Sequence, residues 1–231
     1  MVYVISDIHG EYEAFTDLLE KVNFSEKDEL YVLGDCIDRG EKSIEVLYEM
    51  MMRPNIYPIL GNHEFMALRN LKRLVKEITD ENCDEILSNE SIKELLLWQN
   101  DGGSKTIKQF TELNMQERND IIEYLGEFAL YDEILVNNKS FVLVHAGLDN
   151  FSVKKRLEEY TLSELIFKAP DYEKVYFKDR YLVTGHLPTI TTIGNMGSVI
   201  IKNNHIAIDC GKVFGGRLAM VCLNTFDIYY S

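Results

Sequence analysis

The chain has 231 residues, of which 46% are hydrophobic and 27% are charged, which is ordinary for a globular protein and too apolar for a disordered one. This length predicts a single domain, residues 1–231, with room for a sizeable core. The formal net charge of −14 argues against nucleic acid and anionic membrane as partners, because their phosphates attract Lys and Arg.

The N-terminal sequence MVYVISDIHG reads as a strand and lacks the basic region and apolar run of a signal peptide. Other apolar runs are too short to predict a membrane span. The four cysteines form no CxxC pair, and a chain of this length does not need disulfides. We therefore expect a reduced, cytoplasmic protein, with the oligomeric state and any redox role of Cys36 or Cys210 left open.

Strand-like and helical patterns alternate at the start of the chain. Strands are expected at Met1–Ile5, Leu30–Leu33 and Ile56–Leu60, with an amphipathic helix after the first of them. A second helix is expected from about Lys42 to Met52, and Pro54 ends it. This βαβαβ order predicts parallel strands with a functional site at their carboxyl edge.

The rest of the chain predicts a helical insertion followed by more strands. The insertion is expected around residues 62–127, and Asn137-Asn138 has the composition of a hairpin turn. The chain is thus expected to be an α/β protein. The later strands are expected at Ala129–Val136, Ser140–Val144, Tyr181–Thr184, Ser198–Ile201, His205–Ile208, Arg217–Leu223 and Phe226–Tyr230.

Four of the five histidines lie directly after predicted strands, beside glycine and acidic residues. Taken singly, each His or Asp is most simply a hydrogen-bonded turn residue. Together they converge on one sheet edge and offer carboxylate, imidazole and amide ligands without a thiolate, which suits Mn²⁺, Fe or Zn²⁺. Six ligands suit two metal ions bridged by one carboxylate. The candidate ligands are Asp7, His9, Asp35, Asn62, His145 and His186.

The ordered motifs resemble those of the calcineurin-like metallophosphoesterases, in the phosphoprotein-phosphatase branch. They are SDIHG (6–10), GDCIDRG (34–40), GNHE (61–64), HAG (145–147) and GH (185–186). The segments WQNDGG (98–103) and IAIDCGKVFGGRL (206–218) are similar to the compact bacterial and phage enzymes of that branch, of the phage lambda type. The resemblance implies a four-layer α/β/β/α sandwich of two mixed sheets flanked by helices.

The resemblance also implies a dinuclear metal centre, in which a metal-bridging hydroxide attacks phosphorus in line without a phosphoenzyme. We expect Mn²⁺ in both positions, with Fe or Zn²⁺ as alternatives. The implied ligands are Asp7, His9 and His186 for one ion, Asn62 and His145 for the other, and Asp35 for both.

Residues next to these ligands have the chemistry to act on a phosphoester. His63 adjoins Asn62 and is the candidate general acid for the leaving oxygen. Asp38 would hold the His63 ring and favour its protonated form, and Arg39 would bind phosphate with two donors. Glu64 is expected to have a structural role in its loop.

Two positions depart from the family pattern. The segment 165–169, LIFKA, has Phe where a Trp is usual and lacks the second phosphate-binding Arg. WQNDGG has Asp101 where Asn is usual, so the hydrogen-bonding role of that position is open. The basic residues that could replace the missing Arg are Lys168, Lys174, Lys178 and Arg180.

We predict a metal-dependent phosphomonoesterase that acts on phosphoserine or phosphothreonine in proteins, with phosphotyrosine also conceivable. The alternative is a bis(5'-nucleosyl)-tetraphosphatase that hydrolyses diadenosine tetraphosphate at the same dinuclear site. The substrate would be a phosphorylated protein or a small phosphoester. A non-catalytic scaffold is disfavoured because no ligand is missing, and a nucleic-acid phosphodiesterase is disfavoured because no basic groove is readable.

Overall fold

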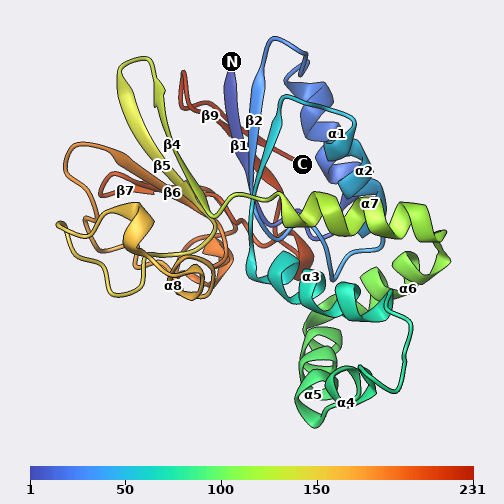
Figure 1. The fold of residues 1–231 in the computed structure, drawn as a ribbon. Helices are drawn as coiled ribbons and strands as arrows, with labels where there is room; N and C mark the ends of the chain where they lie inside the picture. Colours follow the sequence, from blue (N-terminus) through green and yellow to red (C-terminus); the bar gives the residue numbers. More distant parts are fainter.

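The computed structural model describes all 231 residues and contains two five-stranded sheets packed face to face (Figure 1). In the first sheet, β1, β2 and β3 are parallel, as predicted, and β9 and β10 extend it with antiparallel pairing. Its strands, in the order β10-β9-β1-β2-β3, are β1 (Val2–Ile5), β2 (Glu29–Leu33), β3 (Ile56–Ile59), β9 (Ala219–Cys222) and β10 (Ile228–Tyr230).

The second sheet is also mixed, because β5, β6 and β8 are parallel while β4 and β7 pair antiparallel at the two edges. Asn137 and Asn138 form the turn between β4 and β5, and both take left-handed backbone angles. The strands, in the order β4-β5-β6-β8-β7, are β4 (Tyr131–Val136), β5 (Lys139–Val144), β6 (Tyr181–Thr184), β7 (Ile200–Lys202) and β8 (His205–Ala207).

Helices cover the outer faces of the two sheets and complete the four predicted layers (Figure 1). α1 (Tyr12–Lys21), α2 (Ser43–Met51) and α7 (Met115–Gly126) share one core cluster with the outer face of the first sheet, and α8 (Leu162–Ile166) packs on the second. Four further helices fall in the predicted insertion, and α4 and α5 project from the body (Figure 1). They are α3 (Asn62–Leu74), α4 (Cys83–Ile86), α5 (Asn89–Trp98) and α6 (Ser104–Glu112).

Alternation along the strands explains how the layers stack. In β1, Tyr3 and Ile5 face the helices, whereas Val4 faces the second sheet and contacts a cluster that includes Phe141 and Val183. This apolar cluster between the sheets holds them together, so that the carboxyl ends of β1, β2, β5 and β6 meet at one edge. None of the helices is long and apolar enough to cross a membrane.

The predicted strands are all present, although several bounds shift by one or two residues. The clearest correction is at the last strand, expected at 226–230, which begins instead at Ile228. Phe226 has a φ of 64° and its N–H donates to Cys222, so it belongs to the turn between β9 and β10.

Candidate dinuclear metal centre

The six predicted metal ligands lie together at the edge where the two sheets meet. His186 is partly exposed and the other five are buried, with exposed fractions of 7% or less. The first sheet supplies four of them from the loops after its parallel strands, and the second sheet supplies two imidazoles. The six are Asp7 and His9 after β1, Asp35 after β2, Asn62 at the start of α3, His145 after β5 and His186 after β6.

Left-handed backbone turns aim these side chains into the site. Asp7, His9, Asp35 and Asp38 have φ angles of 51°, 48°, 52° and 72°. This conformation costs an ordinary residue about 1–2 kcal/mol, so something must stabilise each turn. The Asp7 N–H donates to Gly34 and the His9 N–H to Asp35, at 3.0 and 2.9 Å, and these bonds connect the first two loops.

Two glycines are required because carboxylates pass close to the backbone. A Cβ on Gly61 would lie 2.3 Å from Asp35 Oδ1, and one on Gly185 would lie 2.2 Å from Asp7 Oδ2. Both distances are shorter than van der Waals contact. Any side chain at either position would therefore displace a candidate metal ligand.

Glu64 stabilises the loop that carries Asp35. Its fully buried carboxylate accepts hydrogen bonds from the N–H groups of Asp35 and Cys36, each at 2.8 Å, and from that of Gly61 at 3.0 Å. These bonds agree with the structural role expected for Glu64. The carboxylate fixes the second and third loops relative to each other.

The histidine rings are oriented to present lone pairs to a cation. His9 Nδ1 donates to the Ile37 carbonyl at 2.9 Å and His145 Nδ1 donates to the Leu33 carbonyl at 2.7 Å, which leaves each Nε2 as an acceptor. Burial lowers the pKa of both rings well below the usual range, so both are neutral, the form that binds metals. His145 Nε2 then faces Asn62 Oδ1 at 3.0 Å and Asp35 Oδ2 at 3.4 Å, so three acceptors converge.

The buried carboxylates also need a cation. Burial raises the pKa of Asp35 to about 7, and it raises the pKa of Asp7 well above its usual range, with Asp209 as the next cause. Asp209 follows β8, and no sequence pattern predicts it as part of this site. Divalent ions would reverse these shifts by compensating the negative charge. The donor set therefore fits the implied metal ions.

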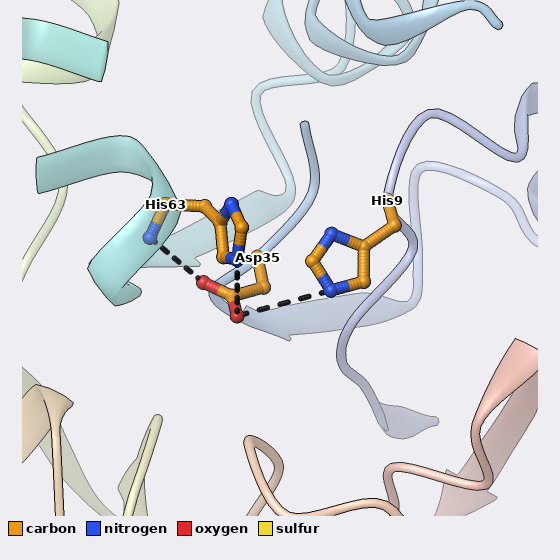
Figure 2. A group of neighbouring side chains, drawn as sticks. All are labelled: His9, Asp35 and His63. Atoms are coloured by element: carbon orange, nitrogen blue, oxygen red, sulfur yellow. Dashed lines mark hydrogen bonds and ion pairs between the residues drawn. The ribbon is translucent and has the colours of Figure 1, made fainter. Parts of the chain in front are cut away.

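The potential ligand atoms form two groups that share Asp35. One group is His9, Asp35 and His63, shown in Figure 2, where the two rings flank the carboxylate. The other is Asp35, His145 and His186, with His186 Nδ1 lying 3.2 Å from His145 Nε2. Asp7 reaches His186 through the backbone, because its Oδ2 accepts from the His186 N–H at 3.0 Å. The shared position of Asp35 is what a bridging ligand requires.

His63 and Asp38 form a buried pair beside these groups. His63 Nδ1 and Asp38 Oδ2 lie 2.7 Å apart. Trp98 Nε1 donates to the same oxygen at 2.7 Å, and the Thr106 hydroxyl donates to Oδ1 at 2.6 Å. The sequence patterns predict neither Trp98 nor Thr106 as part of the site, although Trp98 begins the WQNDGG motif. Both come from the helical insertion and fix the orientation of Asp38.

His63 Nε2 points into the site without a partner. It is fully buried, makes no hydrogen bond, and lies 3.9 Å from Asp35 Oδ2. Burial alone would lower the pKa of His63, but the Asp35 and Asp38 carboxylates outweigh it and raise that pKa to about 9. Both carboxylates therefore favour the protonated ring, whose Nε2 N–H would face the candidate ligands.

Arg39 extends over the same space from the second loop. Its Nη1 lies 2.8 Å from His9 Nε2, and its Nη2 donates to Asp101 Oδ1 at 3.0 Å. Of the four other basic candidates, Arg180 pairs with Glu133, and Lys174 lies over the ring of Phe151.

Lys168 is on a loop that contacts the site. Its carbonyl accepts from the Gly147 N–H, next to the HAG motif that carries His145. Nothing comparable places Lys178 at the site.

The cysteines at the motif loops do not pair. Cys36 Sγ donates to Glu64 Oε1 at 3.3 Å, whereas Cys210 is buried without such a partner, and both thiols are free. Burial raises the pKa of each thiol, to about 12 for Cys210, so neither is a reactive thiolate.

Comparison with known families agrees with this geometry. The sequence model of the calcineurin-like phosphoesterases matches residues 1–190. The chain belongs to the calcineurin-like phosphoesterase family. The family is one of phosphoesterases with a dinuclear metal centre.

Curated relatives of this family member carry two different names. Serine/threonine-protein phosphatase 2 of Escherichia coli is 28% identical over 224 residues, which cover 94% of this chain and 90% of the relative. This match extends over nearly the full length of both chains. The symmetrical bis(5'-nucleosyl)-tetraphosphatase of Wigglesworthia glossinidia brevipalpis is 36% identical over 98 residues, 42% of this chain. That match spans 36% of the relative's length.

Solved structures show the same fold at low sequence identity. A protein described as a candidate diadenosine tetraphosphatase superposes with a TM-score of 0.67 and 19% identity, over all of this chain and 92% of the other. A cold-active protein-tyrosine phosphatase of Shewanella superposes with a TM-score of 0.54 and 16% identity, over 99% of this chain and 79% of the other. These likenesses confirm the two-sheet metallophosphoesterase fold.

Proposed function

We propose that this phosphoesterase is a metal-dependent phosphomonoesterase that acts on phosphoserine and phosphothreonine in proteins. The observation that carries the proposal is the position of His63, whose buried Nε2 has no hydrogen-bond partner and lies beside the shared Asp35. A proton donor at this place serves a leaving oxygen that departs poorly as an anion, and the alkoxide of serine or threonine is such a group.

We assign the metal ligands from the two groups that share Asp35. One divalent ion would bind Asp7 and His9, and the other Asn62 and His145. The contact between His186 and His145 favours His186 as a ligand of the second ion, whereas the motifs had paired it with Asp7 and His9. When bound, such ions acidify water and neutralise charge on phosphoryl oxygens. Mn²⁺ is the proposed metal, with Fe or Zn²⁺ as alternatives.

The protein's own residues complete the reaction. Arg39 would donate two hydrogen bonds to the phosphoryl oxygens and hold phosphorus in line. As a water oxygen bonds to phosphorus and releases one proton to solvent, the bond from phosphorus to the ester oxygen breaks, and that oxygen takes the proton from His63 Nε2. Asp38 holds the ring through Nδ1 and favours its charged form. A proton from water then restores His63.

Similarity over most of the chain supports the protein substrate. The relative named serine/threonine-protein phosphatase 2 aligns with 94% of this chain, including both sheets. The protein's charge of −14 also favours phosphorylated targets that are neutral or basic around the phosphate.

A dinucleoside tetraphosphate is the second candidate substrate. Several relatives named symmetrical bis(5'-nucleosyl)-tetraphosphatase have higher identity, up to 42% in Buchnera aphidicola, over 42% of this chain. The one of Nitrosospira multiformis is 26% identical over 64% of this chain. The proposed metal centre would serve either substrate, because both reactions break a bond between phosphorus and oxygen.

One preparation of Mn²⁺-loaded protein can decide between the candidates. We expect a larger kcat/KM for a phosphoserine peptide than for diadenosine tetraphosphate, and two metal ions per chain by elemental analysis. The reverse preference would establish the second candidate. Failure to hydrolyse both substrates at full metal occupancy would reject both.

A further inference from the structure

Asp101 places a carboxylate at the exit of the site, beside both phosphate-handling side chains. Its Oδ1 accepts from Arg39 Nη2 at 3.0 Å, and its Oδ2 lies 3.7 Å from His63 Nε2. Asp101 is 47% exposed, whereas His63 is fully buried. Of the carboxylates that face His63, Asp35 and Asp38 are buried, and Asp101 is the one on the solvent side.

The backbone fixes Asp101 in this position. It belongs to the kinked turn Gln99–Gly103, which joins α5 to α6. Gly102 has a φ of 109°, its carbonyl accepts from the Arg39 N–H at 3.1 Å, and a Cβ there would lie 2.5 Å from Arg39 Cγ. A Cβ on Gly103 would lie 2.6 Å from the Trp98 indole. The turn thus packs between Arg39 and Trp98, whose indole donates to Asp38.

We propose that Asp101 is a specificity-determining residue that disfavours leaving groups with negative charge next to the reacting phosphate. This inference rests on the proposed function, in which His63 Nε2 protonates the leaving oxygen. The leaving group would then lie against Nε2 and near Asp101, whose Oδ2 is 3.7 Å from that atom. A charge on that group would meet the Asp101 carboxylate within a few ångströms, at the range where like charges repel.

The two candidate substrates differ in that charge. When a phosphoserine peptide is hydrolysed, the group bonded through the leaving oxygen is an uncharged serine side chain. When diadenosine tetraphosphate is hydrolysed, the leaving oxygen belongs to another phosphate, which carries negative charge. Asp101 therefore favours the phosphoprotein over the dinucleotide, and the Asn usual in similar motifs would not discriminate in this way.

The test is the ratio of kcat/KM for diadenosine tetraphosphate to that for a phosphoserine peptide with neutral flanking residues. Asp101→Asn keeps the shape and removes the charge, so we expect this ratio to rise about tenfold. The control is Asp84→Asn, which makes the same change on exposed α4 and should leave the ratio unchanged. Raising the salt concentration should shrink the difference between wild type and Asp101→Asn. A ratio within twofold of wild type, or an equal rise in the control, would overturn the inference.

A binding measurement separates this inference from the proposed function. Calorimetry on Mn²⁺-loaded protein would compare inorganic pyrophosphate with inorganic phosphate, since pyrophosphate adds a charged group on the leaving side. We expect Asp101→Asn to strengthen pyrophosphate binding relative to phosphate binding, even if neither substrate is turned over. An unchanged relative affinity contradicts the role of Asp101, whereas absent turnover with a changed affinity contradicts the proposed function alone.

Discussion

The two sheets contribute unequally to the site. The first supplies four of the six proposed metal ligands, together with His63, Asp38 and Arg39, from loops connected by backbone hydrogen bonds. The second supplies His145 and His186, and both are tied back to the first sheet, through Leu33 and Asp7. The difference indicates that the first sheet carries the reactive groups, while the second closes the site over them.

The largest expected effect comes from the residue that both ligand groups share. Asp35→Asn removes the common carboxylate, and the loss of metal-based charge stabilisation should lower kcat/KM by about 10⁴-fold. Elemental analysis should find fewer than one metal ion per chain. As the matched change in the second sheet, His186→Ala should retain one ion. If Asp35→Asn keeps two ions, the bridging assignment is wrong.

His63→Asn tests whether the reactive group in the first sheet is an acid. The variant should bind both metal ions and lose about 10²–10³-fold in kcat on a phosphoserine peptide. On p-nitrophenyl phosphate, whose leaving group departs without a proton, the loss should be small. Equal losses on the two substrates would indicate that His63 has another role.

His205 is the histidine outside the site, and its replacement tests whether this part of the second sheet contributes to stability and not to catalysis. It is buried in β8, bonded to the Thr184 hydroxyl at 2.8 Å, and burial lowers its pKa to about 4. The unfolded chain, with a histidine pKa near 6.5, binds the extra proton between pH 6.5 and 4, so stability falls as pH falls through that window. The free energy of unfolding should fall by about 3 kcal/mol across this window.

Urea unfolding at pH 7 and pH 4.5 measures this effect. His205→Gln cannot titrate, so its free energy of unfolding should fall less between the two pH values than that of wild type. An equal fall in both proteins would place the acid sensitivity elsewhere. Activity at pH 7 should be retained, because His205 lies outside both ligand groups.

The smallest expected effect concerns the helical insertion. Trp98→Phe keeps an aromatic ring but removes the donor to Asp38, a charge-assisted hydrogen bond whose loss should lower kcat about tenfold. The apparent pKa of the acidic group in the pH profile of kcat should also shift, because Asp38 holds the His63 ring. Thr106→Ser, which retains the hydroxyl bound to Asp38, is the control. Unchanged kinetics in Trp98→Phe would limit the insertion to a packing role.

Much of the site could be predicted because parallel strands bring their carboxyl ends to one edge. The motifs after β1, β2 and β3 therefore converge whatever the details of packing, and the roles of Asp35 and Glu64 follow from their neighbours in sequence. The convergence of His145 and His186 on this edge was predictable for the same reason, and their role as ligands stays a prediction. Their mutual contact was not predictable, because it depends on how the two sheets pack.

The contacts that the helical insertion makes with the site could not be predicted from the sequence. Trp98 and Thr106 reach Asp38 across 60 and 68 residues, and no local pattern encodes such a contact. The position of Asp101 likewise depends on the kinked turn Gln99–Gly103 and on its fit against Arg39. The strand bounds shifted for a simpler reason, since the left-handed turn at Phe226 cannot be inferred from an apolar residue type.

The buried Glu64 carboxylate has a consequence for anion binding. Successive backbone N–H groups that point to one spot form a nest that attracts anions, and the amides of Asp35 and Cys36 do so here. Glu64 fills this nest with an anion that belongs to the protein. These amides are therefore not free to bind a phosphate group beneath the reactive side chains. A phosphate group is left to bind where the proposed metal ions and Arg39 would hold it for hydrolysis.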